Sequence, residues 1–243
     1  MQRLGLIGGT GLDHWGEAVA THSIDSVYGQ PSDTLAEYKV GKLQVFFLPR
    51  HGGQHRIPPH AVNYRANIDV FKQMAVDGII AINAVGGISD SNAPGTLTVP
   101  DQLIDYTWGR AHSFSLTAQD LLQHIEFAKP FGGHLRARLI RAAMTAQVNV
   151  NDGGCLGVTQ GPRLETAAEI RRFERDGCDM VGMTSMPEAA LAREAGLDYA
   201  CLCVNANWCA GLEDEPVTMS AIEATLKDAM VKVRQILATL FEE

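Results

Sequence analysis

The chain has 243 residues, 46% of them hydrophobic, and is therefore long enough to bury one large core. Its formal net charge of −8 and its pI of about 5.5 argue against a nucleic-acid partner, because such binding needs a clustered excess of lysine and arginine. No apolar run approaches the roughly 18 residues of a membrane helix, and the N-terminal MQRLGLIGGT lacks the features of a secretory signal, so we expect a cytoplasmic protein without a membrane partner and with one domain over residues 1–243.

Short apolar runs typical of β-strands alternate with helical patterns along the chain. Strands are expected at residues 3–7, 43–48, 77–82, 178–183 and 199–204. Helices are expected at residues 61–75, 135–147, 165–176, 187–195 and 219–241. This alternation predicts an α/β fold with a largely parallel sheet and helices on both faces. Sheets of this kind bind ligands beyond the carboxyl ends of their strands, so the residues that follow each strand are the first candidates for a site.

The first strand ends in Gly8, Gly9, Thr10 and Gly11. A turn of this kind aims backbone N–H groups and a hydroxyl at an anion, although a tight turn without a ligand has the same sequence. A dinucleotide fingerprint needs a further glycine where His14 stands, which argues against a Rossmann oxidoreductase.

The second strand ends in RHGGQH, residues 50–55. The Arg50 guanidinium is a fork of donors suited to phosphate, and His51 is expected to add a further donor beside it. A structural ion pair is the alternative for Arg50, and a structural role is the alternative for His55.

The next strand ends carry small and hydroxylic residues. Residues 83–87 (NAVGG) let a flat ligand lie on the backbone, or they form a simple strand-to-loop turn. Ser185 is expected to cap the helix that follows, and Thr184 is a candidate for anion binding. Glu188 lies in the first helical turn, where the helix dipole by itself explains a carboxylate.

The last strand ends in Asn205 and Asn207, which are expected to point their amides in the same direction. The nearby Cys201, Cys203 and Cys209 have no second pair or histidine at metal-ligand spacing, so we interpret them as buried thiols. We find no hydrolase triad order, Walker sequence or metal cluster. The residues by themselves therefore predict an α/β enzyme that binds an anion and a flat polar ligand.

Several long motifs then identify a family. LGLIGGTGLD, LPRHGGQHRIPPHAVNYRANI, GVTQGPRLET and MTSMPEAALAREAG resemble the methylthioadenosine phosphorylase branch of the purine nucleoside phosphorylases. The resemblance implies a single domain with a twisted mixed central sheet flanked by helices, and a homotrimer with sites near subunit boundaries. It also implies a small-molecule nucleoside substrate with inorganic phosphate as co-substrate, and no metal or organic cofactor.

The resemblance also implies site residues. Phosphate-site positions correspond to Thr10, Arg50, His51, Asn83, Ala84 and Thr184, with Asn83 standing where threonine is usual. The sugar position corresponds to Met183, and the base pocket to Val85, Gly86, Leu164 and Ala206, with Leu164 in place of an aromatic residue. The 5′ substituent meets Pro59, Met219 and Ile222, with His124 from a neighbouring subunit, and Glu165 replaces a small residue without a clear role.

The two asparagines indicate the base. Asn205 and Asn207 stand where this branch has aspartates, and we expect them to be the catalytic contacts to the purine. An amide both donates to O6 and accepts from N1–H of a 6-oxopurine, whereas an ionised carboxylate only accepts. Buried groups left unpaired cost roughly 1–3 kcal/mol each, so the substitution predicts hypoxanthine over adenine.

The apolar 5′ positions favour a methylthio group over a free hydroxyl, and methionine suits a thioether. The expected substrate is therefore S-methyl-5′-thioinosine. The alternatives are a general phosphorylase of inosine and guanosine, a methylthioadenosine phosphorylase, and a nucleoside-binding sensor without catalysis.

Overall fold

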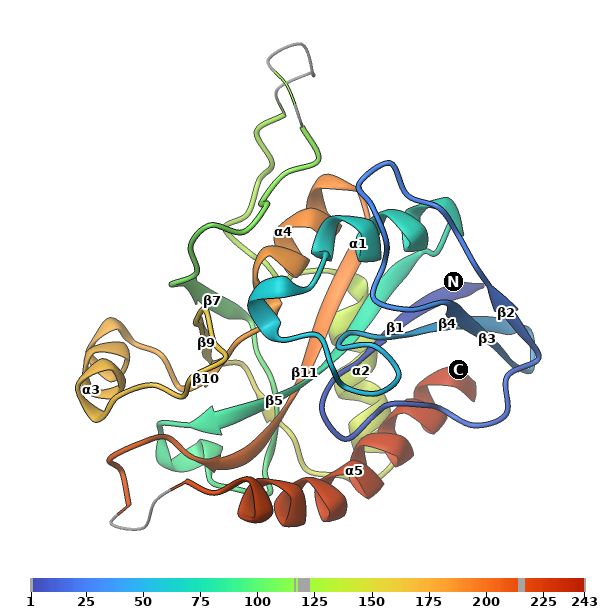
Figure 1. Cartoon of the computed structure of the whole chain (residues 1–243). Helices are drawn as coiled ribbons and strands as arrows, with labels where there is room; N and C mark the ends of the chain where they lie inside the picture. The colour runs from blue at the N-terminus through green and yellow to red at the C-terminus, as the bar shows by residue number, and fades with distance from the viewer. Residues whose placement is uncertain (1, 116, 118–122, 214–216, 243) are drawn as a thin grey trace.

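The computed structural model describes residues 2–115, 117, 123–213 and 217–242. Its centre is four parallel strands that match four of the predicted runs: β4 pairs with β1, β1 with β5, and β5 with β11 (Figure 1). These strands are β1 (Arg3–Gly8), β4 (Leu43–Pro49), β5 (Gly78–Gly87) and β11 (Asp198–Trp208). Each is almost wholly buried, as expected for strands covered on both faces.

Shorter strands extend this centre into a mixed sheet. The main path runs β2-β3-β4-β1-β5-β10-β9-β7, and β11 continues from β5 to β6 and β8. The β2–β3, β3–β4, β5–β10 and β6–β11 pairs are antiparallel. The shorter strands are β2 (Ala20–His22), β3 (Leu35–Val40), β6 (Leu97–Val99), β7 (Gln102–Asp105), β8 (Asn151–Asp152), β9 (Cys155–Val158) and β10 (Met180–Gly182). The predicted mixed sheet is confirmed, and β10 is the fifth predicted strand, shorter than expected.

Helices cover both faces of the sheet, as the alternating pattern predicts. The helices α1 and α4 pack on one face, and α2 and α5 pack together on the other (Figure 1). Alternate residues of each central strand serve the two cores; for example, Leu6 belongs with α2 and α5 and Ile7 with α1 and α4. The helices are α1 (Tyr64–Gln73), α2 (His134–Thr145), α3 (Ala167–Asp176), α4 (Ser185–Glu194) and α5 (Met219–Glu242), with short 3-10 turns η1 (Pro59–Ala61) and η2 (Asp90–Asn92).

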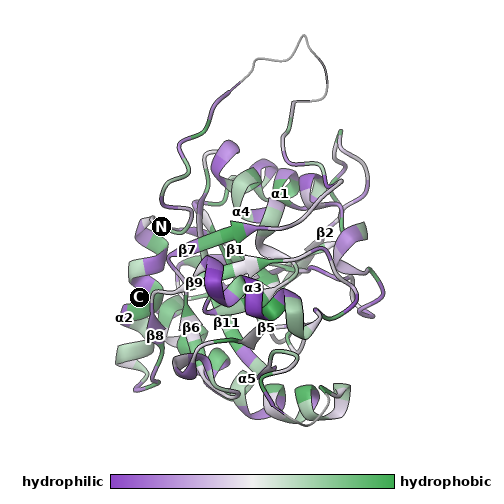
Figure 2. Ribbon diagram, turned by 90° about the vertical axis from the view of Figure 1, so that its left-hand side faces the viewer, coloured by the Kyte–Doolittle hydropathy of each residue, from purple (hydrophilic) through white to green (hydrophobic). Residues whose placement is uncertain are grey.

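Two segments lie away from this central body. The helix α3 is largely hydrophilic in Figure 2 and contributes only Ile170 and Phe173 to a small separate core. The described parts of the segment between β7 and α2 lead outward from the body (Figure 1). The helices in the described part of the chain are all too short or too polar to cross a membrane.

The five cysteines are free. Cys201, Cys203 and Cys209 are buried, which confirms the interpretation of these residues as core thiols. Within the described ranges, no group of three histidine, cysteine, aspartate or glutamate side chains is arranged to hold a metal ion.

Candidate active site

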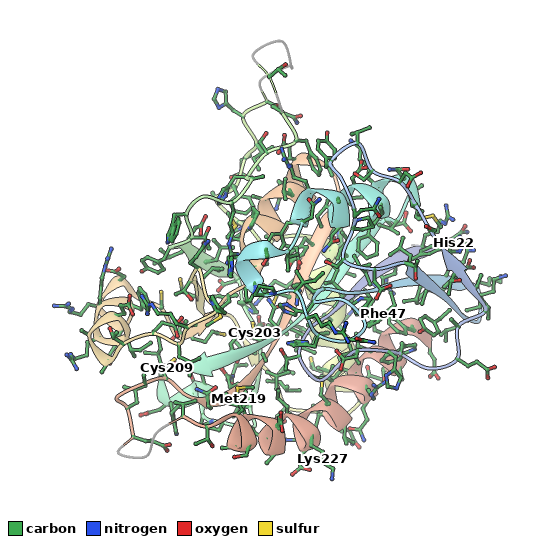
Figure 3. All side chains as sticks on the ribbon, viewed as in Figure 1. His22, Phe47, Cys203, Cys209, Met219 and Lys227 are labelled. Carbon is green, nitrogen blue, oxygen red and sulfur yellow. The ribbon has the colours of Figure 1, made fainter. Side chains whose placement is uncertain are left out.

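One cavity of about 380 Å³ lies at the carboxyl ends of the four central strands, within the size range of ligand sites. Cys209, just after β11, and Met219, at the start of α5, both line it (Figure 3). The predicted site residues that line it are Thr10, Arg50, His51, Pro59, Asn83, Ala84, Val85, Gly86, Leu164, Glu165, Met183, Thr184, Ala206, Asn207, Met219 and Ile222. Two predicted residues, Asn205 and His124, are not among its lining residues.

Arg50 enters the cavity from a buried ion pair. Its Nε and Nη2 atoms donate to the two carboxylate oxygens of Glu188, each at 2.8 Å, and Nη1 donates to the Ile82 carbonyl at 3.0 Å. Tyr199 Oη donates to the same carboxylate at 2.8 Å. Burial opposes the charge on Arg50, but the pair with Glu188 outweighs it and raises the arginine pKa. Three of the five guanidinium N–H groups are used in this way, which leaves one on each Nη atom for a ligand.

The ion pair and the ligand site therefore coexist at Arg50, where the sequence presented them as alternatives. Glu188 is more than a helix-dipole residue, because it is completely buried and orients the arginine. The sequence signal for this role was weak, since the two residues are 138 positions apart.

The glycine turn after β1 is required for close approach. A Cβ atom on Gly9 would lie 2.3 Å from the Ile82 carbonyl oxygen and 3.0 Å from Arg50 Nη1. Gly11 has a φ of +89°, in the left-handed region that favours glycine. The turn thus brings Thr10 and its backbone to the same end of the cavity as Arg50.

His51 is a neutral acceptor at this end. Its Nδ1 lies 2.7 Å from the Ile57 carbonyl oxygen. Because a carbonyl oxygen can only accept a hydrogen bond, the proton of the neutral ring is on Nδ1, and Nε2 carries a free lone pair. Burial, reinforced by the charge of Arg50, lowers its pKa to about 4. The expectation that His51 adds a donor beside Arg50 is therefore wrong for the neutral ring. Nε2 of the neutral ring accepts a hydrogen bond instead.

Asn83 fixes the start of α4. Its Nδ2 donates to Ser185 Oγ at 2.6 Å, and its Oδ1 accepts from Thr184 Oγ1 at 3.3 Å. The α4 N-terminus has no side-chain cap, so the prediction that Ser185 caps the helix is wrong. The serine hydroxyl is instead occupied by Asn83, a partner that lies in β5 and is invisible to local sequence rules.

The end of β11 contains a β-bulge that separates the two asparagines. Asn205 is opposite Val85 and Asn207 is opposite Gly86, so Ala206 is the extra residue. The bulge breaks the alternation of side chains, and the prediction that both amides point the same way is wrong. Asn207 lines the cavity, whereas Asn205 is completely buried outside it.

Asn205 ties β11 to the neighbouring strand β6. Its Nδ2 lies 3.0 Å from Thr96 Oγ1 and 3.2 Å from Thr98 Oγ1, whose protons are directed to Ala93 and Asn92. Its Oδ1 is buried without a hydrogen-bond partner among the described residues. The geometry therefore assigns Asn205 a contact between strands and not a contact with the cavity.

A carboxylate faces the Asn207 end of the cavity. Glu165 Oε1 accepts from Thr159 Oγ1 at 2.5 Å, and burial raises the pKa of this carboxyl group. Cys209 is close to both groups. A Cβ atom added to Gly86 would lie close to Cys209 Sγ and to Asn207 Nδ2. Burial raises the Cys209 pKa to about 12, and the charge of Glu165 adds to this effect. Glu165, which had no clear role from the sequence, thus lies at the Asn207 end of the cavity.

The rim of the cavity carries exposed apolar residues as well as the exposed His55 and Arg56. Leu164 and Met219 line it and remain 47% and 61% exposed, so a large part of the rim is uncovered in one chain. His124 is exposed and belongs to the segment between β7 and α2. A contribution from a neighbouring subunit stays a prediction.

The fold and the site together define the class of protein. Residues 3–242 match the profile of the phosphorylase superfamily. The chain therefore belongs to that superfamily, and the predicted nucleoside-phosphorylase-like fold and enzyme class are confirmed.

The chain is similar to particular nucleoside phosphorylases within this superfamily. The chain is 48% identical to a Xanthomonas campestris protein named probable S-methyl-5′-thioinosine phosphorylase, over 98% of this chain and 96% of that protein. It is 37% identical to a 6-oxopurine nucleoside phosphorylase of Pyrococcus furiosus, over 99% and 92% of the two chains. A structure of methylthioadenosine phosphorylase from Schistosoma mansoni with adenine superposes with a TM-score of 0.94 at 34% identity, covering 99% of this chain and 91% of that one.

Proposed function

We propose that the protein catalyses phosphorolysis of S-methyl-5′-thioinosine to hypoxanthine and 5-methylthioribose 1-phosphate, a purine-salvage reaction. The observation that carries this proposal is that the Asn207 amide and the Glu165 carboxylate line the same cavity, with Cys209 close to both. The name of the Xanthomonas relative agrees with it.

The two groups complement a 6-oxopurine. N1–H is a donor, and the Glu165 carboxylate accepts. O6 is an acceptor, and Asn207 Nδ2 retains one N–H besides the one directed to the Trp208 carbonyl at 2.7 Å. Adenine reverses both demands, since its N1 accepts and its 6-amino group donates. The preference for hypoxanthine therefore needs Asn207 and Glu165, while Asn205 holds the strand that positions Asn207.

The opposite end of the cavity suits phosphate. Arg50 offers two N–H groups and Thr10 offers a hydroxyl, and Thr184 and the backbone beside Ala84 line the same cavity. His51 Nε2 accepts from a P–OH group, so a protonated phosphate oxygen fits between His51 and Arg50. Asn83 contributes by fixing Thr184, because both ends of its amide already have protein partners.

The reaction follows from this division. Phosphate attacks C1′ as the C1′–N9 bond breaks, positive charge develops on the sugar beside Met183, and the bonding electrons leave with the base. Interactions that strengthen with this charge separation lower the barrier. Phosphate supplies the counter-charge at one end, and the hydrogen bond from Asn207 stabilises the purine anion at the other.

The sugar substituent meets Pro59, Met219 and Ile222, whose apolar surfaces suit a methylthio group. We further propose a cytoplasmic homotrimer in which His124 covers the exposed rim of a neighbouring site. Phosphate is the co-substrate, with no metal or organic cofactor.

The test is phosphate-dependent turnover of methylthioinosine, inosine and methylthioadenosine in competition, with and without a chelator. We expect hypoxanthine release from methylthioinosine to be fastest and the chelator to have no effect. Faster adenine release from methylthioadenosine would overturn the base assignment. Equal kcat/KM for inosine and methylthioinosine would indicate a general 6-oxopurine phosphorylase, like the Pyrococcus relative.

A further inference from the structure

Arg110 lies behind the cavity and does not line it. It follows β7 at the base of the outward segment seen in Figure 1. Its partners are mainly backbone carbonyls from separate parts of the chain that contribute residues to the cavity, together with the side-chain oxygens of Gln160 and Tyr64.

The guanidinium joins the sugar side of the cavity to the base side. Nη1 donates to the Met183 carbonyl at 2.9 Å and to the Met186 carbonyl at 2.5 Å. Nη2 donates to the Gln160 carbonyl at 2.8 Å and to the Thr159 carbonyl at 3.2 Å. Met183 itself lines the cavity, and Thr159 also binds Glu165.

The same group reaches the 5′ side through Tyr64. Arg110 Nη1 donates to Tyr64 Oη at 3.3 Å, and Tyr64 Oη donates to the Pro59 carbonyl at 2.9 Å. The guanidinium carbon also lies 5.4 Å from the centre of the Tyr64 ring. Gly161 lies where these sides meet, since a Cβ on it would come 2.6 Å from Met183 Sδ and 3.4 Å from Pro59 Cγ.

We propose that Arg110 is a positioning residue that sets the spacing between the sugar, base and 5′ sides of the nucleoside site. This inference rests on the proposed function of the cavity. Four backbone carbonyls, the Gln160 side-chain oxygen and one phenol converge on a single planar cation, and without it their negative ends face one another. Lysine carries its three donors on one nitrogen and cannot reach acceptors that are spread around the edge of a planar guanidinium group.

The consequence is specific to the nucleoside. The segments held by Arg110 carry Pro59, Met183 and Glu165. The stretch between the Met183 and Met186 carbonyls also carries Thr184, but Asn83 holds the Thr184 hydroxyl, and Arg50 is held by Glu188 and the Ile82 carbonyl. Loss of the arginine therefore misplaces the nucleoside relative to a largely intact phosphate site. A displacement of about 1 Å lowers turnover by roughly 10²-fold.

The experiment compares Arg110→Lys and Arg110→Ala with Arg136→Lys. Arg136 is a matched control, because it donates to the Pro100 and Val99 carbonyls, both at 2.9 Å, and does not line the cavity. Thermal melting, kcat, and KM for nucleoside and for phosphate are measured separately. Guanidinium and ammonium ions are added to Arg110→Ala as a rescue test.

For Arg110→Lys we expect kcat/KM for the nucleoside to fall by roughly 10- to 10²-fold, with a much smaller change in the KM for phosphate. Guanidinium, and not ammonium, should restore part of the activity of Arg110→Ala. The control should retain wild-type kcat/KM at temperatures where it is folded. The proposal is overturned if Arg110→Lys behaves like the control, or if its loss of activity only tracks its loss of folded protein.

Wild-type turnover with the best purine nucleoside serves as the reference. A different substrate preference would overturn the proposed function and leave the Arg110 comparison intact. If Arg110→Ala fails to fold, calorimetry of purine-base binding to Arg110→Lys takes its place. Weaker binding than in the wild type supports the positioning role, and unchanged binding together with unchanged kcat/KM overturns it.

Discussion

The two ends of the cavity are built differently. At the phosphate end, Arg50, His51 and Asn83 each have protein partners that fix their orientation before a ligand binds. At the base end, Glu165 lies on a loop and Asn207 on a β-bulge. The phosphate end follows regular parallel strands, whereas the base end depends on departures from regular structure.

This difference separates the reaction from its selectivity. Phosphate is the same for every nucleoside, so its site gains from rigid, prepaid orientation. The base differs between substrates, and two side chains on irregular backbone are enough to reverse the hydrogen-bonding demand. Substitutions at the two ends should therefore have different effects on phosphate binding and on the choice of nucleoside.

Removal of Glu188 should disable the phosphate end. Glu188→Ala leaves the Arg50 charge buried without a partner, which destabilises a protein by about 3–5 kcal/mol. Urea unfolding and the KM for phosphate measure the effect, and Glu188→Gln should retain part of the stability. The control Arg163→Gln breaks an exposed ion pair and should change little. Wild-type stability in Glu188→Ala would contradict the role given to the pair.

Loss of Glu165 should affect the base end alone. Glu165→Ala is expected to lower kcat/KM for methylthioinosine by roughly 10²-fold, as for a hydrogen bond to a charged group worth about 3 kcal/mol, and to leave the KM for phosphate unchanged. Burial raises the Glu165 pKa, so wild-type kcat/KM should fall as the pH drops through that raised value and the carboxylate is protonated. Glu165→Gln should lose this acidic limb. An unchanged limb would assign it to another group.

His51 should make stability pH-dependent. Its pKa is about 4 in the folded protein, so the unfolded chain, with the ordinary value near 6.5, binds more protons between these limits. The contribution of the neutral ring to the free energy of unfolding is therefore fully present above about pH 6.5. It declines by about 3 kcal/mol as the pH falls from there to 4. Urea unfolding of His51→Gln should show a flatter profile over this window, while the exposed His60→Gln keeps the wild-type profile. Identical slopes for wild type and His51→Gln would contradict the buried neutral ring.

The two asparagines should respond differently to the same substitution. Asn207→Asp is expected to raise the ratio of kcat/KM for methylthioadenosine to kcat/KM for methylthioinosine by roughly 10- to 10²-fold, because it exchanges a hydrogen-bond donor for an acceptor. Asn205→Asp should reduce stability, since a carboxylate would face the Thr96 carbonyl now 3.3 Å from the amide nitrogen, without changing the preference. Competition assays and melting temperatures distinguish the two variants. A larger change of preference in Asn205→Asp would reverse the assignment.

The long elements were predictable because their patterns are local. Five strands and five helices follow from apolar periodicity, and the five strands are confirmed at or near their predicted positions. Strands such as β2 and β8 have three and two residues, too few to show a period, and they form because neighbouring strands offer hydrogen-bond partners.

The site was partly predictable for the same reason. Thr10 and Arg50 follow the parallel strands β1 and β4, whose carboxyl ends meet at one edge, so their proximity could be expected. Thr184 follows β10, which runs antiparallel to β5, so its place in the same cavity does not follow from that rule. The partner of Arg50, by contrast, is set by how α4 packs against the sheet. Ser185 shows the same limit, because local rules make it a cap whereas its contact with Asn83 lies 102 positions away.

The sequence by itself determined the α/β architecture, the strand-end location of the cavity and, through its resemblance to a family, the class of enzyme. These depend on hydrophobic periodicity and on residue types placed directly after strands. Only the tertiary structure decided which amide faces the cavity, because one extra residue, Ala206, reverses the alternation of side chains at the end of β11. It likewise decided the pairing of Arg50 with Glu188 and the convergence of distant carbonyls on Arg110, since contacts between distant segments arise from packing and leave no local pattern in the chain.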